Sequence, residues 1–290
     1  MINKVFHFAR VALIAALMIA PAAAQPRRLA PGSKVDLELV LAVDVSASMS
    51  RDEHDLQRRG YVKAFREPSL ITAIKSGDLG RVAVTYVQWS SDQPTQTIPW
   101  TIIASAQDAR TFADKLEAAP LLNGYRTGMS GALIYAADLI DENAIDGARR
   151  VIDVSGDGAN NLGAPVTSAR DTVVRRGIVI NGLPIAPKQP LQWYDVPNLA
   201  LYYHDCVIGG AGAFSVPTQT LDQFGAAIRG KLVSEVAGIY PQERLFQLAQ
   251  ARAAPRADCL GGEKAWNSRM MGFGDDRGPP PVLLDRKSVV

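Results

Sequence analysis

Short, continuous apolar runs alternate with segments of helical periodicity along most of this chain, and this alternation limits the possible folds more than any other feature. Leu37–Val43 is a continuous apolar run, Arg81–Trp89 is rich in Val, Tyr and Trp, and Arg150–Ser155 also has the character of a strand, as expected in a sheet that is covered on both faces. Strands that alternate with helices form parallel sheets with helices packed on both faces. We therefore predict an α/β fold with a doubly wound, mostly parallel sheet flanked by helices.

The other elements follow from helical spacing of apolar residues and from short runs typical of strands. We expect helices at Glu53–Ile74, Ala106–Ala118, Gly128–Asp141, Pro165–Arg176 and Thr220–Val236, and strands at Gln96–Ile103, Gly177–Ile185 and Ala200–Val207. The strand at Gln96–Ile103 should form a hairpin with the strand before it. Beyond Tyr240 the pattern becomes irregular, apart from one short helical pattern at Pro241–Arg252.

The first residues indicate export. Lys4 and Arg10 precede the apolar run Val11–Ala20, and the small residues 22–24 follow it, as in a cleaved secretory signal. The run is shorter than the roughly 20 apolar residues of a spanning helix, so we expect cleavage before Gln25, no membrane span in the mature chain, and a periplasmic or secreted protein. We predict a signal peptide at 1–24, a linker at 25–34, the α/β domain at 35–238 and a partly disordered C-terminal extension at 239–290.

The charge balance argues against a nucleic-acid partner. The chain has 31 Lys and Arg against 29 Asp and Glu, and removal of the signal segment takes away two basic residues and no acidic one. Charges of both signs interleave along segments such as 51–66, whereas a nucleic-acid binder usually presents a basic face. We therefore expect no nucleic-acid binding.

The chain contains two cysteines, Cys206 and Cys259. In an exported protein a lone pair is more often a disulfide than two free thiols. We predict that the two residues pair and tie the extension to the domain. By restricting the unfolded chain, such a bridge would stabilise the fold by about 4 kcal/mol.

Oxygen-bearing side chains follow two of the predicted strands. Asp44, Ser46 and Ser48 come at or directly after the end of the first strand, Asp157 follows a later strand, and Thr127 precedes a predicted helix. Because ligands of open parallel sheets bind outside the carboxyl ends of the strands, we expect these side chains to converge there. A donor set of oxygens without His or Cys suits a hard cation such as Mg²⁺. The sequence therefore predicts a divalent-cation site.

Together these motifs resemble the metal-ion-dependent adhesion site of von Willebrand factor A domains, with D-V-S-A-S after the first strand, a Thr before a helix and G-D-G after a later strand. Trp89 and the motifs G-D-G-A-N-N-L-G at 156–163, I-N-G-L-P-I at 180–185 and Y-Y-H-D-C-V-I-G-G at 202–210 look like an uncharacterised family of exported proteobacterial proteins in that superfamily. The resemblance covers about residues 35–238 and implies a von Willebrand factor A-like, Rossmann-type domain.

The resemblance also implies roles for the five residues. Ser46 and Ser48 would bind the cation directly, Thr127 would join them when a ligand is engaged, and Asp44 and Asp157 would act mainly through water or as hydrogen-bond acceptors. The implied cation is Mg²⁺, with Mn²⁺ or Ca²⁺ as alternatives. An acidic side chain of a protein or cell-envelope ligand would complete the shell, so we expect a binding module and no catalytic residues.

Two positions depart from the commoner pattern. Tyr125 and Arg126 precede Thr127 where small glycines are usual, and Gly156 precedes Asp157 where Thr or Ser is usual. We expect Arg126 to point into solvent.

Two further residues receive expectations of their own. Asn160 is, with Arg126, a candidate for the rim that contacts the ligand. Asp153 is expected to be a strand residue with a local hydrogen bond.

Two other functions stay open. A secreted metal-dependent hydrolase would need a base, and the mature chain offers His54 and His204, but no G-x-S-x-G elbow is present. His54 lies on a helix whose charges suggest exposure, and His204 is expected at a strand end next to the predicted disulfide. The third possibility is an envelope scaffold whose metal site is vestigial.

Overall fold

The computed structural model describes residues 32–91, 93–185, 193, 195–218, 221–239 and 256–272. The predicted signal peptide, most of the predicted linker and the helical pattern at Pro241–Arg252 lie outside the described residues, as do the last residues of the chain. In the part that is described, no helix is long and apolar enough to cross a membrane.

A five-stranded sheet forms the centre of the domain, with the order β4-β3-β2-β6-β7. The strands are β2 (Leu37–Asp44), β3 (Val82–Trp89), β4 (Thr95–Ile103), β6 (Arg150–Gly156) and β7 (Val179–Pro184). All neighbours are parallel except β4, which is antiparallel to β3. Every residue of β2 and β3 is buried, which explains why both strands are mostly apolar. The predicted doubly wound sheet and its hairpin are confirmed.

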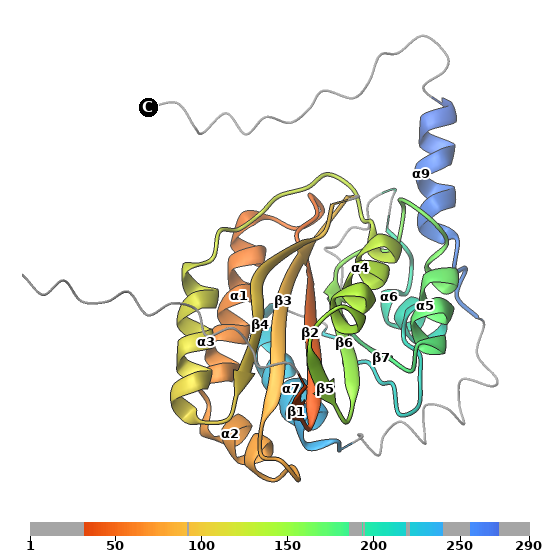
Figure 1. The fold of residues 1–290 in the computed structure, drawn as a ribbon. Coiled ribbons are helices and arrows are strands. Elements are labelled where there is room, and N and C mark those ends of the chain that lie inside the picture. Colours follow the sequence, from red (N-terminus) through yellow and green to blue (C-terminus); the bar gives the residue numbers. More distant parts are fainter. Residues whose placement is uncertain are drawn as a thin grey trace, which may run out of the picture.

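Helices cover both faces of this sheet (Figure 1). One face carries α1 (Arg51–Arg66), α2 (Pro68–Lys75), α3 (Ala106–Ala118) and α7 (Leu221–Ala237), and the other carries α4 (Met129–Asp141), α5 (Val166–Arg175) and α6 (Leu199–Tyr202). Each face has its own hydrophobic core. Phe65 and Phe112 pack with ring centres 4.6 Å apart in the first, and Met129 and Tyr202 are buried in the second. A small parallel pair, β1 (Ser33–Val35) with β5 (Ile145–Gly147), forms a second sheet beside the start of β2.

The single helix predicted at Glu53–Ile74 is wrong, because Pro68 divides it into α1 and α2. Proline has no N–H and disfavours helical geometry in the residue before it, and Glu67 accordingly has the extended angles φ −78° and ψ 133°.

The strand predicted at Ala200–Val207 is also wrong. This segment forms α6 and then a π-helical turn, η1 (Tyr203–Val207). The buried residues Tyr202, Tyr203, Cys206 and Val207 share one helical face, but aromatic and β-branched residues in a short run also favour a strand. A signal for the helix start exists in Asn198, whose side chain accepts a hydrogen bond from the Leu201 N–H.

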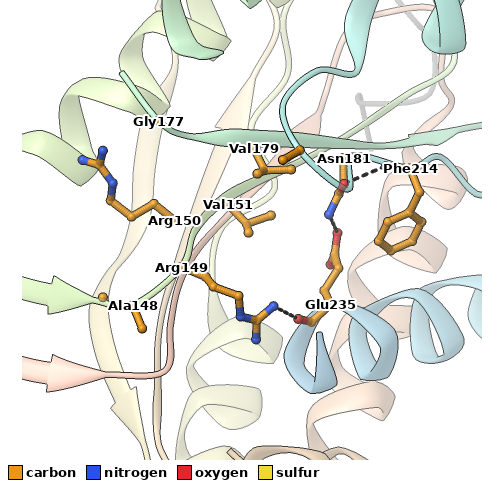
Figure 2. A pocket seen from close by; sticks show the side chains of 11 residues that line it. Ala148, Arg149, Arg150, Val151, Gly177, Val179, Asn181, Phe214 and Glu235 are labelled. Atoms are coloured by element: carbon orange, nitrogen blue, oxygen red, sulfur yellow. Dashed lines mark hydrogen bonds between the residues drawn. The ribbon is translucent and has the colours of Figure 1, made fainter. Parts of the chain in front are cut away.

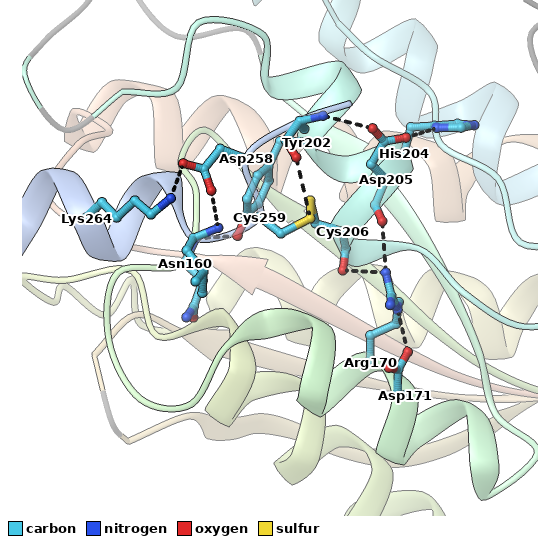
Figure 3. The surroundings of a disulfide bond; sticks show 12 residues. Asn160, Arg170, Asp171, Tyr202, His204, Asp205, Cys206, Asp258, Cys259 and Lys264 are labelled. Carbon is cyan, nitrogen blue, oxygen red and sulfur yellow. Dashed lines mark hydrogen bonds and ion pairs between the residues drawn. A yellow bond between two sulfur atoms is a disulfide. The ribbon is translucent and has the colours of Figure 1, made fainter. Parts of the chain in front are cut away.

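The C-terminal extension contains a helix that the sequence pattern did not predict, α9 (Gly261–Gly272). Its sequence has no apolar stripe, so periodicity gave no signal. The predicted disulfide is confirmed, since Cys206 in η1 and Cys259 just before α9 are bonded (Figure 3). The segments on both sides are held as well: the Ala257 N–H donates to Asp205 at 3.0 Å, and Arg170 donates to the Asp205 and Cys206 carbonyls. In Figure 1, α9 projects beyond the body of the domain.

A buried ionic cluster joins the sheet to α7. Lys231 pairs with Asp153 of β6 at 2.5 Å and with Glu235 one helical turn later, and Asn181 of β7 donates to Glu235 at 2.8 Å. The interpretation of Asp153 as a strand residue with only a local hydrogen bond is therefore wrong, because its partner lies on a helix far along the chain. Burial, followed by the charge of Asp153, raises the pKa of Glu235 to about 8.

A cavity of about 230 Å³ lies beside this cluster, at the amino ends of β6 and β7 (Figure 2). Arg149 lines it and donates hydrogen bonds of 2.7 Å to the carbonyls of Glu235 and Val236, which gives partners to two of the last carbonyls of α7. The cavity is thus at the opposite end of the strands from the predicted cation site.

Candidate metal centre

The predicted site lies where the order of the sheet reverses. The chain passes from β2 to β3 on one side and returns to β6 on the other side of β2. In open α/β sheets this switch point, at the carboxyl ends of the strands, is where ligands bind. Asp44 ends β2, and Asp157 directly follows β6.

A continuous chain of hydrogen bonds connects four of the five predicted residues. The Ser46 N–H donates to Oδ1 of Asp44 at 2.8 Å, the hydroxyls of Ser46 and Ser48 are 3.0 Å apart, and the Ser48 hydroxyl donates to Oδ1 of Asp157 at 2.6 Å. Helix α1 begins just beyond, where Ser50 and Glu53 form a reciprocal capping box. This cap fixes the end of the loop that carries the two serines.

Thr127, the fifth residue, lies beside the loop that carries Asp157. Its Oγ1 is 3.4 Å from the position that a Cβ on Gly158 would occupy. Its N–H donates to Oδ1 of Asn161 at 3.0 Å, and the Asn161 N–H donates back to the Thr127 carbonyl at 2.9 Å. A backbone bridge between Ser46 and Gly124 joins the same segment to the loop after β2. Three loops are thus held together at one edge of the sheet.

Asn160 is not a rim residue, and this prediction is corrected. Its side chain is fully buried and every polar group of it is used. Oδ1 accepts from the Ser130 N–H at 3.0 Å, and Nδ2 donates to the Ala164 carbonyl at 3.1 Å and to Glu263 of α9 at 2.7 Å. Asn160 therefore ties the loop after β6 to α4 and α9.

Asn161, which bonds to the backbone of Thr127, was not among the predicted residues. The two adjacent asparagines in a Gly-rich loop were nevertheless a signal of side-chain to backbone bonding.

Arg126 does not point freely into solvent, and this prediction is also wrong. Its guanidinium carbon lies 4.4 Å from the ring centre of Trp266 on α9, and it donates to the Asn161 side chain and carbonyl.

Gly156, the second departure from the common pattern, has a steric cause. A Cβ at this position would lie 2.7 Å from Oδ2 of Asp44 and 3.2 Å from the Tyr203 hydroxyl. Because Asp44 and Tyr203 fill the space that a Ser or Thr side chain would need, only glycine fits here.

Burial and nearby negative charges raise the pKa values of both acids of the site, Asp44 and Asp157. Asp44 is completely buried, and its Oδ2 has no hydrogen-bond partner among the described residues. Burial, followed by the nearby charge of Asp157, raises the pKa of Asp44 well above its usual range. Burial, together with the charges of Asp195 and Glu53, raises the pKa of Asp157 to about 6. A cation would relieve this repulsion, so the residues fit a divalent ion.

The donor set also restricts the kind of ion. The described residues contain no group of three His, Cys, Asp or Glu that could hold a metal, so an ion at this edge depends on the hydroxyls of Ser46, Ser48 and Thr127. Oxygen donors of this kind suit Mg²⁺, Mn²⁺ or Ca²⁺.

The two histidines considered for hydrolysis occupy other environments. His54 is buried in α1, so the expectation of an exposed position is wrong. His204 is in η1, not at a strand end, and its Nδ1 is 2.8 Å from Asp205 beside the disulfide (Figure 3).

The chain matches a known protein family and has a known fold. A family model described as "Protein of unknown function (DUF1194)" matches residues 34–240. No curated protein matches the sequence. The fold is that of von Willebrand factor A domains.

Among solved structures, proximal thread matrix protein 1 from the mussel byssus is 15% identical with a TM-score of 0.52, over 72% of this chain and 49% of that protein. Another structure of it, described as having a zinc-occupied MIDAS motif, is 14% identical with a TM-score of 0.50, over the same shares of the two chains. The pilus adhesin SpaC from Lactobacillus rhamnosus GG is 12% identical with a TM-score of 0.53, over 71% of this chain and 31% of that protein. The chain therefore matches half or less of the length of these proteins.

Proposed function

Since this chain belongs to the DUF1194 family of proteins of unknown function and has a von Willebrand factor A-like fold, we propose that it is an exported binding module that engages an acidic side chain of a protein partner through a divalent cation. The observation that carries the proposal is the acid pair of the buried Asp44 and the half-buried Asp157, linked through two serines at the switch point of the sheet. Matrix and adhesin proteins with this fold, one of them with an occupied motif of this type, support it.

Each residue has a role in this proposal. The hydroxyls of Ser46, Ser48 and Thr127 hold the cation, and Asp44 and Asp157 balance its charge. When bound, the cation supplies a positive centre that attracts a carboxylate of the partner. Because the hydroxyl ligands are neutral, they leave the ion more electron-poor than carboxylate ligands would, which strengthens its attraction for an incoming acid. We propose Mg²⁺ as the ion, with Mn²⁺ or Ca²⁺ as alternatives.

Calorimetric titration with each of the three ions tests this proposal. We expect one bound ion per chain in the wild type and an affinity at least about tenfold lower in Ser48→Ala, which loses a hydroxyl and its bond to Asp157. Ser76→Ala is the matched control, since Ser76 follows α2 and its hydroxyl donates to the nearby Ala73 carbonyl. The proposal is wrong if none of the three ions binds, or if Ser48→Ala binds them as the wild type does.

Assays of partner binding and of substrate turnover distinguish a binding module from a hydrolase. A binding module should retain a partner in a chelator-sensitive way without consuming ester or phosphate substrates. A scaffold with a vestigial site would retain its partner after the ion is removed.

A further inference from the structure

Three of the six large apolar side chains that are exposed in the described part of the chain lie close to α9 and the loop of Thr127. Tyr125 is 65% exposed, Trp193 is 45% exposed and Met270 is 60% exposed. Tyr125 directly precedes the segment of Thr127, and Met270 lies on α9 one turn after Trp266. Side chains four residues apart share a helix face, so these residues gather around Trp266.

The rings and two arginines form one connected cluster. The ring centre of Trp266 is 5.8 Å from that of Tyr125 and 5.5 Å from that of Trp193. The Arg126 guanidinium lies 4.4 Å from the Trp266 ring centre, and that of Arg269 lies 5.6 Å from the Trp193 ring centre. We call this surface the aromatic ledge and define it by Tyr125, Arg126, Trp193, Trp266, Arg269 and Met270.

The aromatic ledge adjoins the metal centre and is firmly anchored. Arg126 is the residue before Thr127 in the chain. On α9, a Cβ at Gly262 would lie 2.3 Å from the Asn160 carbonyl oxygen, so the start of the helix is packed closely on the loop after β6. The bond between Glu263 and Asn160 and the disulfide at Cys259 hold the same end of α9. The ledge is therefore held in place beside the proposed cation.

The composition of the ledge is that of a protein-binding surface. Tyr, Trp, Arg and Met are enriched where proteins meet, and Trp, Tyr and Arg contribute most of the binding energy. Contiguous exposed apolar side chains on a soluble domain mark such sites. The two guanidiniums add positive charge next to a site that would itself hold a cation, so the complementary surface is acidic.

We propose that the aromatic ledge is a second contact surface for the partner bound at the cation, and that it takes an acidic protein segment with an aromatic or apolar side chain near its carboxylates. This inference rests on the proposed function for the position of the first carboxylate. The inference adds which kinds of residue the partner carries next to that carboxylate.

A selection of short random peptides on the wild-type protein in Mg²⁺ tests the ledge. We expect the selected peptides to contain several acidic residues and at least one aromatic or large apolar residue. Their affinity should fall at least about tenfold in Arg269→Glu and in Met270→Ser, which change exposed side chains of α9. Arg175→Glu and Leu79→Ser, exposed positions outside the ledge, are the matched controls and should bind as the wild type does.

Several results would overturn the inference: peptides without acidic residues, no binding peptide at all, equal binding by the ledge variants and the controls, or dimerisation of the chain that Met270→Ser abolishes. Binding to neutral phospholipid vesicles that the ledge variants lose would assign the surface to a membrane and overturn it as well.

The failure of each proposal can be recognised separately. If chelation abolishes peptide binding and Arg269→Glu does not weaken it, the cation site stands and the ledge is wrong. If Arg269→Glu weakens binding and neither chelation nor Ser48→Ala does, the ledge is supported and the proposed function is wrong.

Discussion

The hydroxyl of Ser48 donates a 2.6 Å hydrogen bond to Asp157, a residue 109 positions later in the chain. This bond joins the loop after β2 to the loop after β6 at the point where the sheet order reverses. It brings a neutral ligand of the proposed cation and a half-buried acid into direct contact, so a change in either loop should affect the other.

Gly156→Ala should destabilise the protein and weaken cation binding. The new Cβ would lie 2.7 Å from Oδ2 of the completely buried Asp44, and forced shifts in a packed interior cost about 1–3 kcal/mol. Urea unfolding measures the loss of stability. Gly131→Ala is the control, because a Cβ there meets nothing within 4 Å and alanine favours the helix over glycine by up to about 1 kcal/mol. Equal stability of the Gly156→Ala variant and the wild type would contradict the described packing.

Removal of the disulfide should destabilise the fold and release α9. The bond joins residues 53 positions apart, and its effect on the unfolded chain corresponds to about 4 kcal/mol. We expect a reductant to lower the free energy of unfolding of the wild type and to make the fluorescence of Trp266 more like that of a solvent-exposed residue. The double variant Cys206→Ala, Cys259→Ala should not respond to the reductant. A wild type that is equally stable with and without reductant would show that the bridge does not support the fold.

The buried cluster around Lys231 should make stability depend on pH through Glu235. Its pKa is raised from 4.5 to about 8 in the folded protein, first by burial and then by Asp153. Between these values the folded state keeps a proton that the unfolded chain releases, so stability falls as pH rises from about 4.5 to about 8 and changes little from this group above that.

Glu235→Gln tests this dependence, because glutamine keeps the shape and cannot ionise. The free energy of unfolding of the variant should therefore improve relative to the wild type as pH rises from 5 to 8. Glu142→Gln, at an exposed position after α4, is the control and should follow the wild type. Parallel pH curves for the wild type and Glu235→Gln would contradict the raised pKa.

Asn160→Ala should separate α9 from the domain without touching a proposed ligand. The substitution leaves the Ser130 N–H without its acceptor and Glu263 without its donor, and a buried group left unsatisfied costs about 1–3 kcal/mol. Thermal unfolding should show this loss, and limited proteolysis should cut the extension faster than in the wild type. An unchanged digestion pattern would show that Asn160 does not anchor α9.

The sheet and the position of the site were predictable because they depend on local patterns. Buried strands such as β2 have continuous apolar runs, and the chain order of the motifs places Asp44 and Asp157 at one edge of a parallel sheet. The break at Pro68 was also visible in the sequence. The strand predicted at Ala200–Val207 failed for a different reason, since a short apolar run of this kind fits both a strand and a helix.

The contacts of α9 and of the ionic cluster could not be predicted from local patterns. Arg126 and Trp266 are 140 positions apart, and Asp153 meets Lys231 on a helix far along the chain. Such partners depend on tertiary packing, which periodicity does not encode. An arginine or an aspartate in a sequence therefore looks the same whether it is solvated, stacked or buried in an ion pair.

The most direct test of the central claim is the anomalous diffraction of crystals grown with Mn²⁺. The account predicts one strong anomalous peak at bonding distance, about 2.2 Å, from the hydroxyl oxygens of Ser46 and Ser48, and no such peak in crystals of Ser46→Ala. No anomalous peak at this edge of the sheet, or a peak that Ser46→Ala leaves unchanged, would contradict the account.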